Sequence, residues 1–156
     1  VGALLSEEKI PYIVDTSGAV SLTESVKKVL LQSQSVLLDL KFWNDESYRT
    51  NTGGGIDPVL KTLSYLDSIN KKTVIRTVIV PDINDSEAVL EHYLDLLSGF
   101  SCISKYELLA FHTMGFFKYE QLGISNPLLK TPPLSKERLT KLQNFVDHSR
   151  SRRGES

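Results

Sequence analysis

The chain has 156 residues and a mass of 17.5 kDa, which is the usual size of one compact domain. Hydrophobic residues make up 40% and charged residues 24%, a globular composition that excludes wholesale disorder. The 18 Lys and Arg residues nearly balance the 19 Asp and Glu residues, which excludes a nucleic-acid-binding domain driven by bulk positive charge.

Apolar runs alternate with segments of helical periodicity along the chain. The first half predicts a strand, a helix, a strand and the start of a further helix at residues 10–15, 21–32, 35–40 and 44–47. Three glycines then interrupt the pattern before a helix, strand, helix, strand and helix at residues 58–70, 73–80, 86–98, 104–111 and 135–148. Residues 149–156 are polar and are expected to form a disordered tail.

This order predicts an α/β fold with a parallel sheet or barrel built from about four βα units within residues 1–148. Crossovers in such units are right-handed, so the carboxyl ends of all four strands should meet at one rim. Functional residues of βα barrels lie at that rim.

The ends of the chain and its single cysteine carry further expectations. No apolar run reaches the roughly 18 residues that a membrane span needs, so no membrane partner is expected. Cys102 stands alone, which excludes an internal disulfide framework and fits a reducing, cytoplasmic setting. The chain opens with Val1 instead of methionine, and residues 2–5 have the composition of a helix already under way, so a piece of a longer protein is expected.

Charged side chains occur at the expected strand ends. Asp15 ends the first strand, Asp39 and Lys41 end the second, Arg76 lies within the third, and His112 follows the fourth. Side chains of a strand alternate between its two faces, so Asp39 and Lys41 share one face, as do Arg76 and Val78.

Two interpretations of this charged group stand side by side. Carboxylates and cations together suit a zwitterionic ligand, because the carboxylates can bind its ammonium and the cations its carboxylate. Alternatively, Asp39, Lys41 and Arg76 form a structural ion-pair network that closes the mouth of the barrel, since a buried guanidinium needs an anionic partner.

Four motifs in order resemble a known family. DTSG at 15–18, LDLK at 38–41, IRTVIVP at 75–81 and LLAFH at 108–112 are similar to the second half of the glycyl-radical-enzyme activating enzymes, most closely those that act on pyruvate formate-lyase. The resemblance implies part of a (β/α)6 barrel of the radical S-adenosylmethionine (SAM) class, a group of oxidoreductases. In that family a 4Fe–4S cluster held by a CxxxCxxC loop cleaves SAM, and the 5′-deoxyadenosyl radical takes a hydrogen atom from a glycine of the partner enzyme.

The resemblance also implies roles for individual residues. Asp15 and Thr16 are similar to a turn that meets the methionine ammonium and helps to bind a monovalent cation. Asp39, with the Leu37 carbonyl in support, is similar to a further cation ligand. The remaining SAM contacts would be Lys41 and Arg76 at the carboxylate and ribose side, Val78 at the adenine, and His112 at the ribose or adenine.

The implied partners are a glycyl-radical enzyme, pyruvate formate-lyase above all, and an electron donor such as flavodoxin or ferredoxin. The chain departs from the family because it contains neither CxxxCxxC nor the Gly-Gly-Glu motif of an earlier strand, and both are expected upstream of Val1. The chain alone is therefore expected to be inactive and to bind SAM weakly. The alternative is a non-catalytic module that binds a nucleoside or a protein. An unpaired edge at the first strand further predicts self-association.

Overall fold

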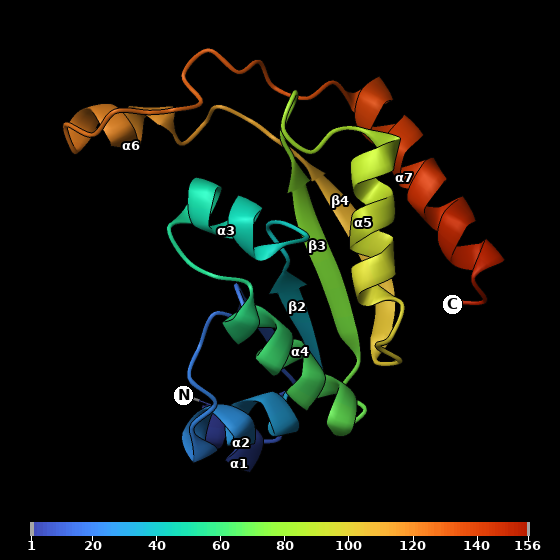
Figure 1. Ribbon diagram of the computed structural model, residues 1–156. Helices are drawn as coiled ribbons and strands as arrows, with labels where there is room; N and C mark the ends of the chain where they lie inside the picture. The colour runs from blue at the N-terminus through green and yellow to red at the C-terminus, as the bar shows by residue number, and fades with distance from the viewer. Residues whose placement is uncertain (1, 156) are drawn as a thin grey trace.

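The computed structural model describes residues 2–155 and contains four parallel strands in one sheet. The strands are β1 (Ile13–Thr16), β2 (Ser35–Asp39), β3 (Thr73–Ile79) and β4 (Ile103–Ala110), and they lie in the order β1-β2-β3-β4. Neighbours in the sheet are neighbours in the chain, and each is joined to the next through helical segments (Figure 1). The expected α/β fold with parallel βα units is confirmed.

Seven helices occur within residues 2–155: α1 (Gly2–Glu7), α2 (Glu24–Gln32), α3 (Asp45–Thr52), α4 (Asp57–Ser68), α5 (Glu87–Leu97), α6 (Phe116–Gln121) and α7 (Lys136–Arg152). Short polar residues begin four of them by accepting a hydrogen bond from a backbone amide of the first turn, namely Thr23, Asn44, Ser86 and Ser135. None of the helices among the described residues is long and apolar enough to cross a membrane.

The hydrophobic core lies between the sheet and the helices. Alternate residues of β3 are buried, with Ile75 and Ile79 on the helix side and Arg76 and Val78 half-buried on the other face. In β2, Leu38 is fully buried in the same core. Such alternation follows from the two-residue period of a strand, and it leaves the charged residues together on the face opposite the core.

The last helix extends beyond its expected end, which corrects the boundary drawn at residue 149. Residues 149–152 are helical, and Ser149 and Arg150 are buried, so these four residues do not form a disordered tail. Arg150 donates from Nη2 to the Ile103 carbonyl at 3.1 Å, and Arg153 pairs with Glu91 at 2.5 Å. These contacts between side chains and the body of the protein extend the helix; Ser156 lies outside the described residues.

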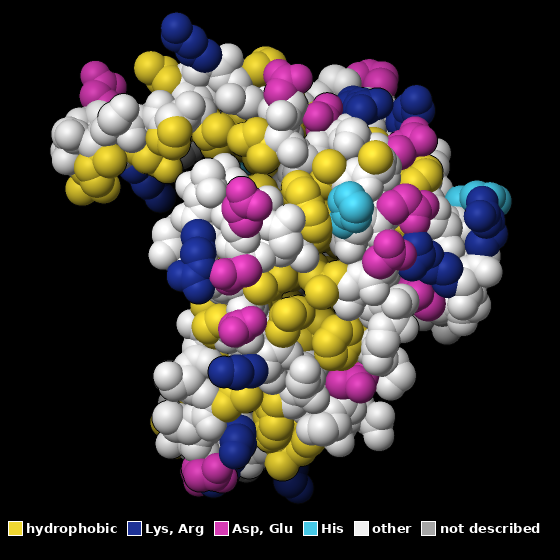
Figure 2. All heavy atoms as spheres, viewed as in Figure 1, with side chains coloured by type: hydrophobic (Ala, Val, Ile, Leu, Met, Phe, Trp, Pro, Cys, Tyr) yellow, Lys and Arg dark blue, Asp and Glu magenta, His cyan; other side chains and the backbone are white. Residues whose placement is uncertain are grey.

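Helix α6 was not expected from the sequence, where this segment has no clear helical periodicity. It belongs to an arm that leaves the carboxyl end of β4 and extends away from the body before the chain returns to α7 (Figure 1). Hydrophobic side chains gather on this arm in Figure 2, and the exposed ones include Met114, Phe117, Leu122 and Leu129.

Candidate functional site

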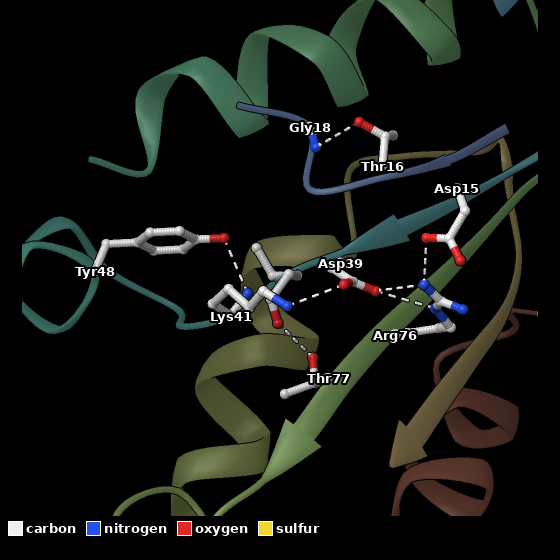
Figure 3. A network of polar contacts seen from close by, with 9 residues as sticks. Asp15, Thr16, Gly18, Asp39, Lys41, Tyr48, Arg76 and Thr77 are labelled. Carbon is white, nitrogen blue, oxygen red and sulfur yellow. Dashed lines mark hydrogen bonds and ion pairs between the residues drawn. The ribbon is translucent and has the colours of Figure 1, made fainter. Parts of the chain in front are cut away.

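Four charged side chains meet near the carboxyl ends of β1 and β2, and we call them the ion-pair cluster: Asp15 of β1, Asp39 of β2, Lys41 just beyond β2, and Arg76 of β3 (Figure 3). The Arg76 Nη2 atom lies 2.5 Å from Asp15 Oδ1 and 2.8 Å from Asp39 Oδ1. Arg76 Nε donates to the same Asp39 oxygen at 3.0 Å. The second Asp39 oxygen accepts from Lys41 Nζ at 2.9 Å.

Strand register explains why these residues meet. Asp39 of β2 is paired with Arg76 of β3, and Asp15 of β1 is paired with Leu37, two residues before Asp39. Residues paired across parallel strands project to the same face, so the guanidinium of Arg76 reaches across β2 to the carboxylate on β1. The structure thus brings Asp15, Asp39, Lys41 and Arg76 together.

Asp39 and Arg76 are held in their charged forms by their neighbours in the cluster. Burial acts to raise the pKa of Asp39, but hydrogen bonds from Lys41 and Arg76 outweigh it and hold that pKa below its usual value. Burial likewise acts to lower the pKa of Arg76, and the Asp39 and Asp15 carboxylates reverse this and raise it. The side chain of Arg76 is 17% exposed, whereas that of Asp15 is 61% exposed and open to a ligand.

The remaining predicted residues lie at different places in the fold around the ion-pair cluster. Val78 lies on the same strand face as Arg76, and Leu37 lies two residues before Asp39 in β2. The Thr16 hydroxyl accepts from the Gly18 amide at 3.0 Å, so it closes the turn after β1 (Figure 3). His112 follows β4 and is exposed. The SAM contacts and the monovalent-cation site drawn from the resemblance stay predictions.

A set of buried hydroxyls, which was not predicted from the sequence, lies directly behind the cluster. Tyr48 Oη accepts from the Lys41 amide at 2.9 Å, and Tyr93 Oη donates to the Lys41 carbonyl at 2.9 Å. Thr77 Oγ1 donates to the Leu40 carbonyl at 2.8 Å. Tyr48 and Tyr93 occupy core positions of α3 and α5. The hydrophobic periodicity that predicts such helices treats a tyrosine ring as apolar and gives no information about its hydroxyl.

Clusters of His, Cys, Asp and Glu side chains are the usual metal centres of proteins. Within residues 2–155, no group of three or more His, Cys, Asp and Glu side chains is placed to hold a metal ion. Cys102 is buried just before β4, at the amino end of the strands, and burial raises the pKa of its thiol to about 11. A 4Fe–4S cluster needs several thiolates, so the residues of this chain do not fit one.

Comparison with known proteins agrees with the resemblance noted in the sequence. No protein-family model matches the chain. The pyruvate formate-lyase-activating enzyme of Clostridium pasteurianum is 31% identical over 143 residues, which cover 92% of this chain and 59% of that enzyme. The chain therefore spans about six tenths of the length of this relative.

Solved structures of low sequence identity share the fold. A domain of a pyruvate-formate lyase-activating enzyme from Bacteroides vulgatus matches 94% of this chain and 83% of that domain, with a TM-score of 0.69 and 15% identity. Streptococcus suis SuiB bound to S-adenosylmethionine matches 99% of this chain and 32% of its own, with a TM-score of 0.70 and 16% identity. A radical SAM methyltransferase from Sphaerobacter thermophilus matches 87% of this chain and 37% of its own, with a TM-score of 0.60 and 17% identity. The chain is thus similar in sequence to pyruvate formate-lyase-activating enzymes over most of its length, and its sheet and helices share the fold of these solved structures.

Proposed function

We propose that this chain is the SAM-binding portion of a radical SAM activase that generates a glycyl radical on a partner enzyme, pyruvate formate-lyase by its homology. The observation that carries the proposal is the ion-pair cluster at the carboxyl ends of the strands, where βα folds bind their ligands. A site for SAM would explain why this chain places two acids and two bases on one face of its sheet.

The charges of the cluster match the methionine end of SAM. That end carries one ammonium and one carboxylate, and the exposed Asp15 carboxylate supplies an acceptor for the first. Lys41, with 38% of its side chain exposed, and Arg76 supply donors for the second. Val78, half-buried on the same face as Arg76, offers an apolar surface to the adenine ring.

The reaction of the whole enzyme needs groups that this chain does not supply. A 4Fe–4S cluster would deliver the electron that cleaves SAM, and a donor such as flavodoxin or ferredoxin would reduce that cluster. The one cysteine, Cys102, is buried before β4 and remote in the fold from the carboxyl ends. We therefore expect that the chain alone binds SAM weakly and releases no 5′-deoxyadenosine when a reductant and SAM are added.

The test is a ¹H–¹⁵N NMR titration of the chain with SAM up to about 5 mM, a range that detects millimolar dissociation constants. Shifts are expected at the amides around Asp15, Asp39 and Arg76, and they should disappear in Lys41→Met. Lys105→Met is the matched control, because Lys105 pairs with a carboxylate two residues along its own strand at 2.8 Å, as Lys41 does at 2.9 Å. This control should keep the SAM-induced shifts.

Two outcomes would contradict the proposal. The first is a titration without shifts at the carboxyl ends of the strands. The second is binding that Lys41→Met leaves unchanged and that S-adenosylhomocysteine or adenosine reproduces at equal affinity. The second result would favour a non-catalytic nucleoside-binding module, since such a site would recognise the purine and ribose without the methionine charges.

A further inference from the structure

The backbone of Leu40 and Lys41 lies beyond the end of β2, and side-chain hydroxyls hold it there. The Leu40 amide still bonds to the Arg76 carbonyl of β3 at 2.9 Å, but the next three polar groups bond to side chains. Thr77 donates to the Leu40 carbonyl, Tyr48 accepts from the Lys41 amide, and Tyr93 donates to the Lys41 carbonyl. Both backbone groups of Lys41 are therefore bonded to tyrosines from two different helices, α3 and α5.

These hydroxyls are buried, and that of Tyr93 has a second hydrogen-bond partner. Tyr48 is 3% exposed and Tyr93 is fully buried. Tyr93 Oη also accepts from Asn84 Nδ2 at 3.2 Å, and Asn84 in turn bonds to the backbone of Val78 and Val80. Burial raises the pKa of both tyrosines, so each keeps its phenolic proton at neutral pH.

The tyrosine rings alone would satisfy the packing of this region. Tyr48 stacks edge-on against Phe42 at 6.1 Å between ring centroids, and Tyr93 does so against Trp43 at 5.5 Å. Phenylalanine at either position would fill the same space without a polar group to bury. The hydroxyls therefore have a separate effect, which is to fix the conformation of one residue, Lys41.

We propose that Tyr48 and Tyr93 are positioning residues that hold the Lys41 backbone so that its ammonium stays on Asp39, at the place where the ligand's carboxylate binds. The ligand part of this inference rests on the proposed function, but the positioning part does not. Neither tyrosine hydroxyl contacts the ligand in this arrangement, because both are buried behind the cluster and directed to backbone atoms.

The first experiment needs no ligand. The order parameter of the Lys41 side chain at Cε is measured by NMR relaxation in the unchanged chain, Tyr48→Phe and Tyr93→Phe. Tyr12→Phe is the matched control, since it also removes a tyrosine hydroxyl bonded to a backbone group, the Val29 carbonyl at 3.0 Å. Lys41 should become more mobile in the first two variants and stay unchanged in the control. Equal Lys41 mobility in all four proteins would overturn the proposal.

Because Tyr48→Phe and Tyr93→Phe are tested separately, the experiment still decides if one of them misfolds. Tyr48→Phe leaves the Lys41 amide without its acceptor, which lowers stability. Tyr93→Phe is milder, because Asn84 Nδ2 keeps its bond to the Val78 carbonyl at 3.0 Å. A loss of melting temperature that matches the control, with an unchanged Lys41 order parameter, would show that the hydroxyls only stabilise the fold.

The second experiment measures SAM affinity in the same four proteins. Tyr48→Phe and Tyr93→Phe should each bind SAM about tenfold more weakly, which corresponds to roughly 1.4 kcal/mol, because binding must then order the Lys41 side chain. Tyr12→Phe should bind as the unchanged chain does. Unchanged SAM affinity in both Tyr48→Phe and Tyr93→Phe would overturn the inference that the tyrosines support ligand binding. If the unchanged chain itself does not bind SAM, the proposed function fails, and the order parameters still decide whether the tyrosines position Lys41.

Discussion

At the scale of single residues, Arg76 determines the geometry of the ion-pair cluster. Its one guanidinium contacts carboxylates from two other strands, with Nη2 shared between Asp15 and Asp39 and Nε also on Asp39. A guanidinium has several donors in a fixed plane, and this allows one side chain to bridge two acids. This side-chain bridge joins the edge strand β1 to β2 and β3, in addition to the backbone hydrogen bonds of the sheet.

Arg76→Lys tests this bridge. An ammonium keeps the charge but cannot satisfy both carboxylates with the same geometry, so the free energy of unfolding should fall by about 1 kcal/mol. Arg49→Lys is the control, because Arg49 pairs with Asp45 within one exposed helix turn and its loss should cost at most about 0.5 kcal/mol. Urea unfolding of both variants measures the difference. Equal effects would mean that Arg76 makes an ordinary surface ion pair.

The sequence was sufficient to predict the charged part of the site but not its support. Asp39 and Lys41 were predicted on one face of their strand, and Arg76 and Val78 on one face of theirs, because strand alternation depends only on residue spacing. Tyr48 and Tyr93 were not predicted, because the partner of a buried hydroxyl depends on how α3 and α5 pack against the end of β2. Spacing along a chain contains no information about such contacts between distant segments.

At the scale of elements, helices with a capping residue and an apolar face were predicted, while α6 and the last turn of α7 were not. α2 and α5 follow the expected periodicity and begin after Thr23 and Ser86. α6 has no buried residue, and the last turn of α7 is polar, so neither carries a hydrophobic pattern. Their helicity depends on local turns and, in α7, on Arg150 and Arg153.

Helix α4 is linked to the start of β4 through Asp67. Its carboxylate accepts from the Cys102 amide at 2.9 Å and from Ser101 Oγ at 3.1 Å. The amide bond, and to a lesser degree the serine bond, lower the pKa of Asp67 although burial acts to raise it. The folded protein thus favours the ionised form of this group.

This lowered pKa predicts a pH dependence of stability. The ionised Asp67 stabilises the folded state above the unfolded pKa, near 3.8, and that contribution disappears as the pH falls through the lower folded value. Asp67→Asn should therefore reduce the free energy of unfolding by about 1 kcal/mol at pH 7. The difference should begin to shrink as the pH falls below 3.8 and should vanish below the folded pKa. Urea unfolding from pH 7 to 3 measures it, with the exposed Glu8→Gln as control. A difference that is independent of pH would contradict the assignment.

At the scale of the whole molecule, the two edges of the sheet are protected unequally. On the β4 edge, Gln143 of α7 accepts from the Leu108 amide at 2.8 Å and donates to the Tyr106 carbonyl at 2.9 Å, and Arg150 donates to the Ile103 carbonyl. Among residues 2–155, β1 has a strand neighbour on one side only, and no corresponding side chain covers its outer edge. Free edges of this kind pair with other chains.

The open β1 edge predicts that the chain associates with a second copy of itself through this strand. Ile13 and Ile124 are a matched pair for the test, because they are 55% and 57% exposed and only Ile13 lies in β1. A lysine in an edge strand opposes pairing, so Ile13→Lys should weaken self-association at least about tenfold, whereas Ile124→Lys should leave it unchanged. Sedimentation equilibrium at several concentrations measures both. A monomer at every concentration would contradict the prediction, and equal weakening by both variants would place the contact on the α6 arm instead of β1.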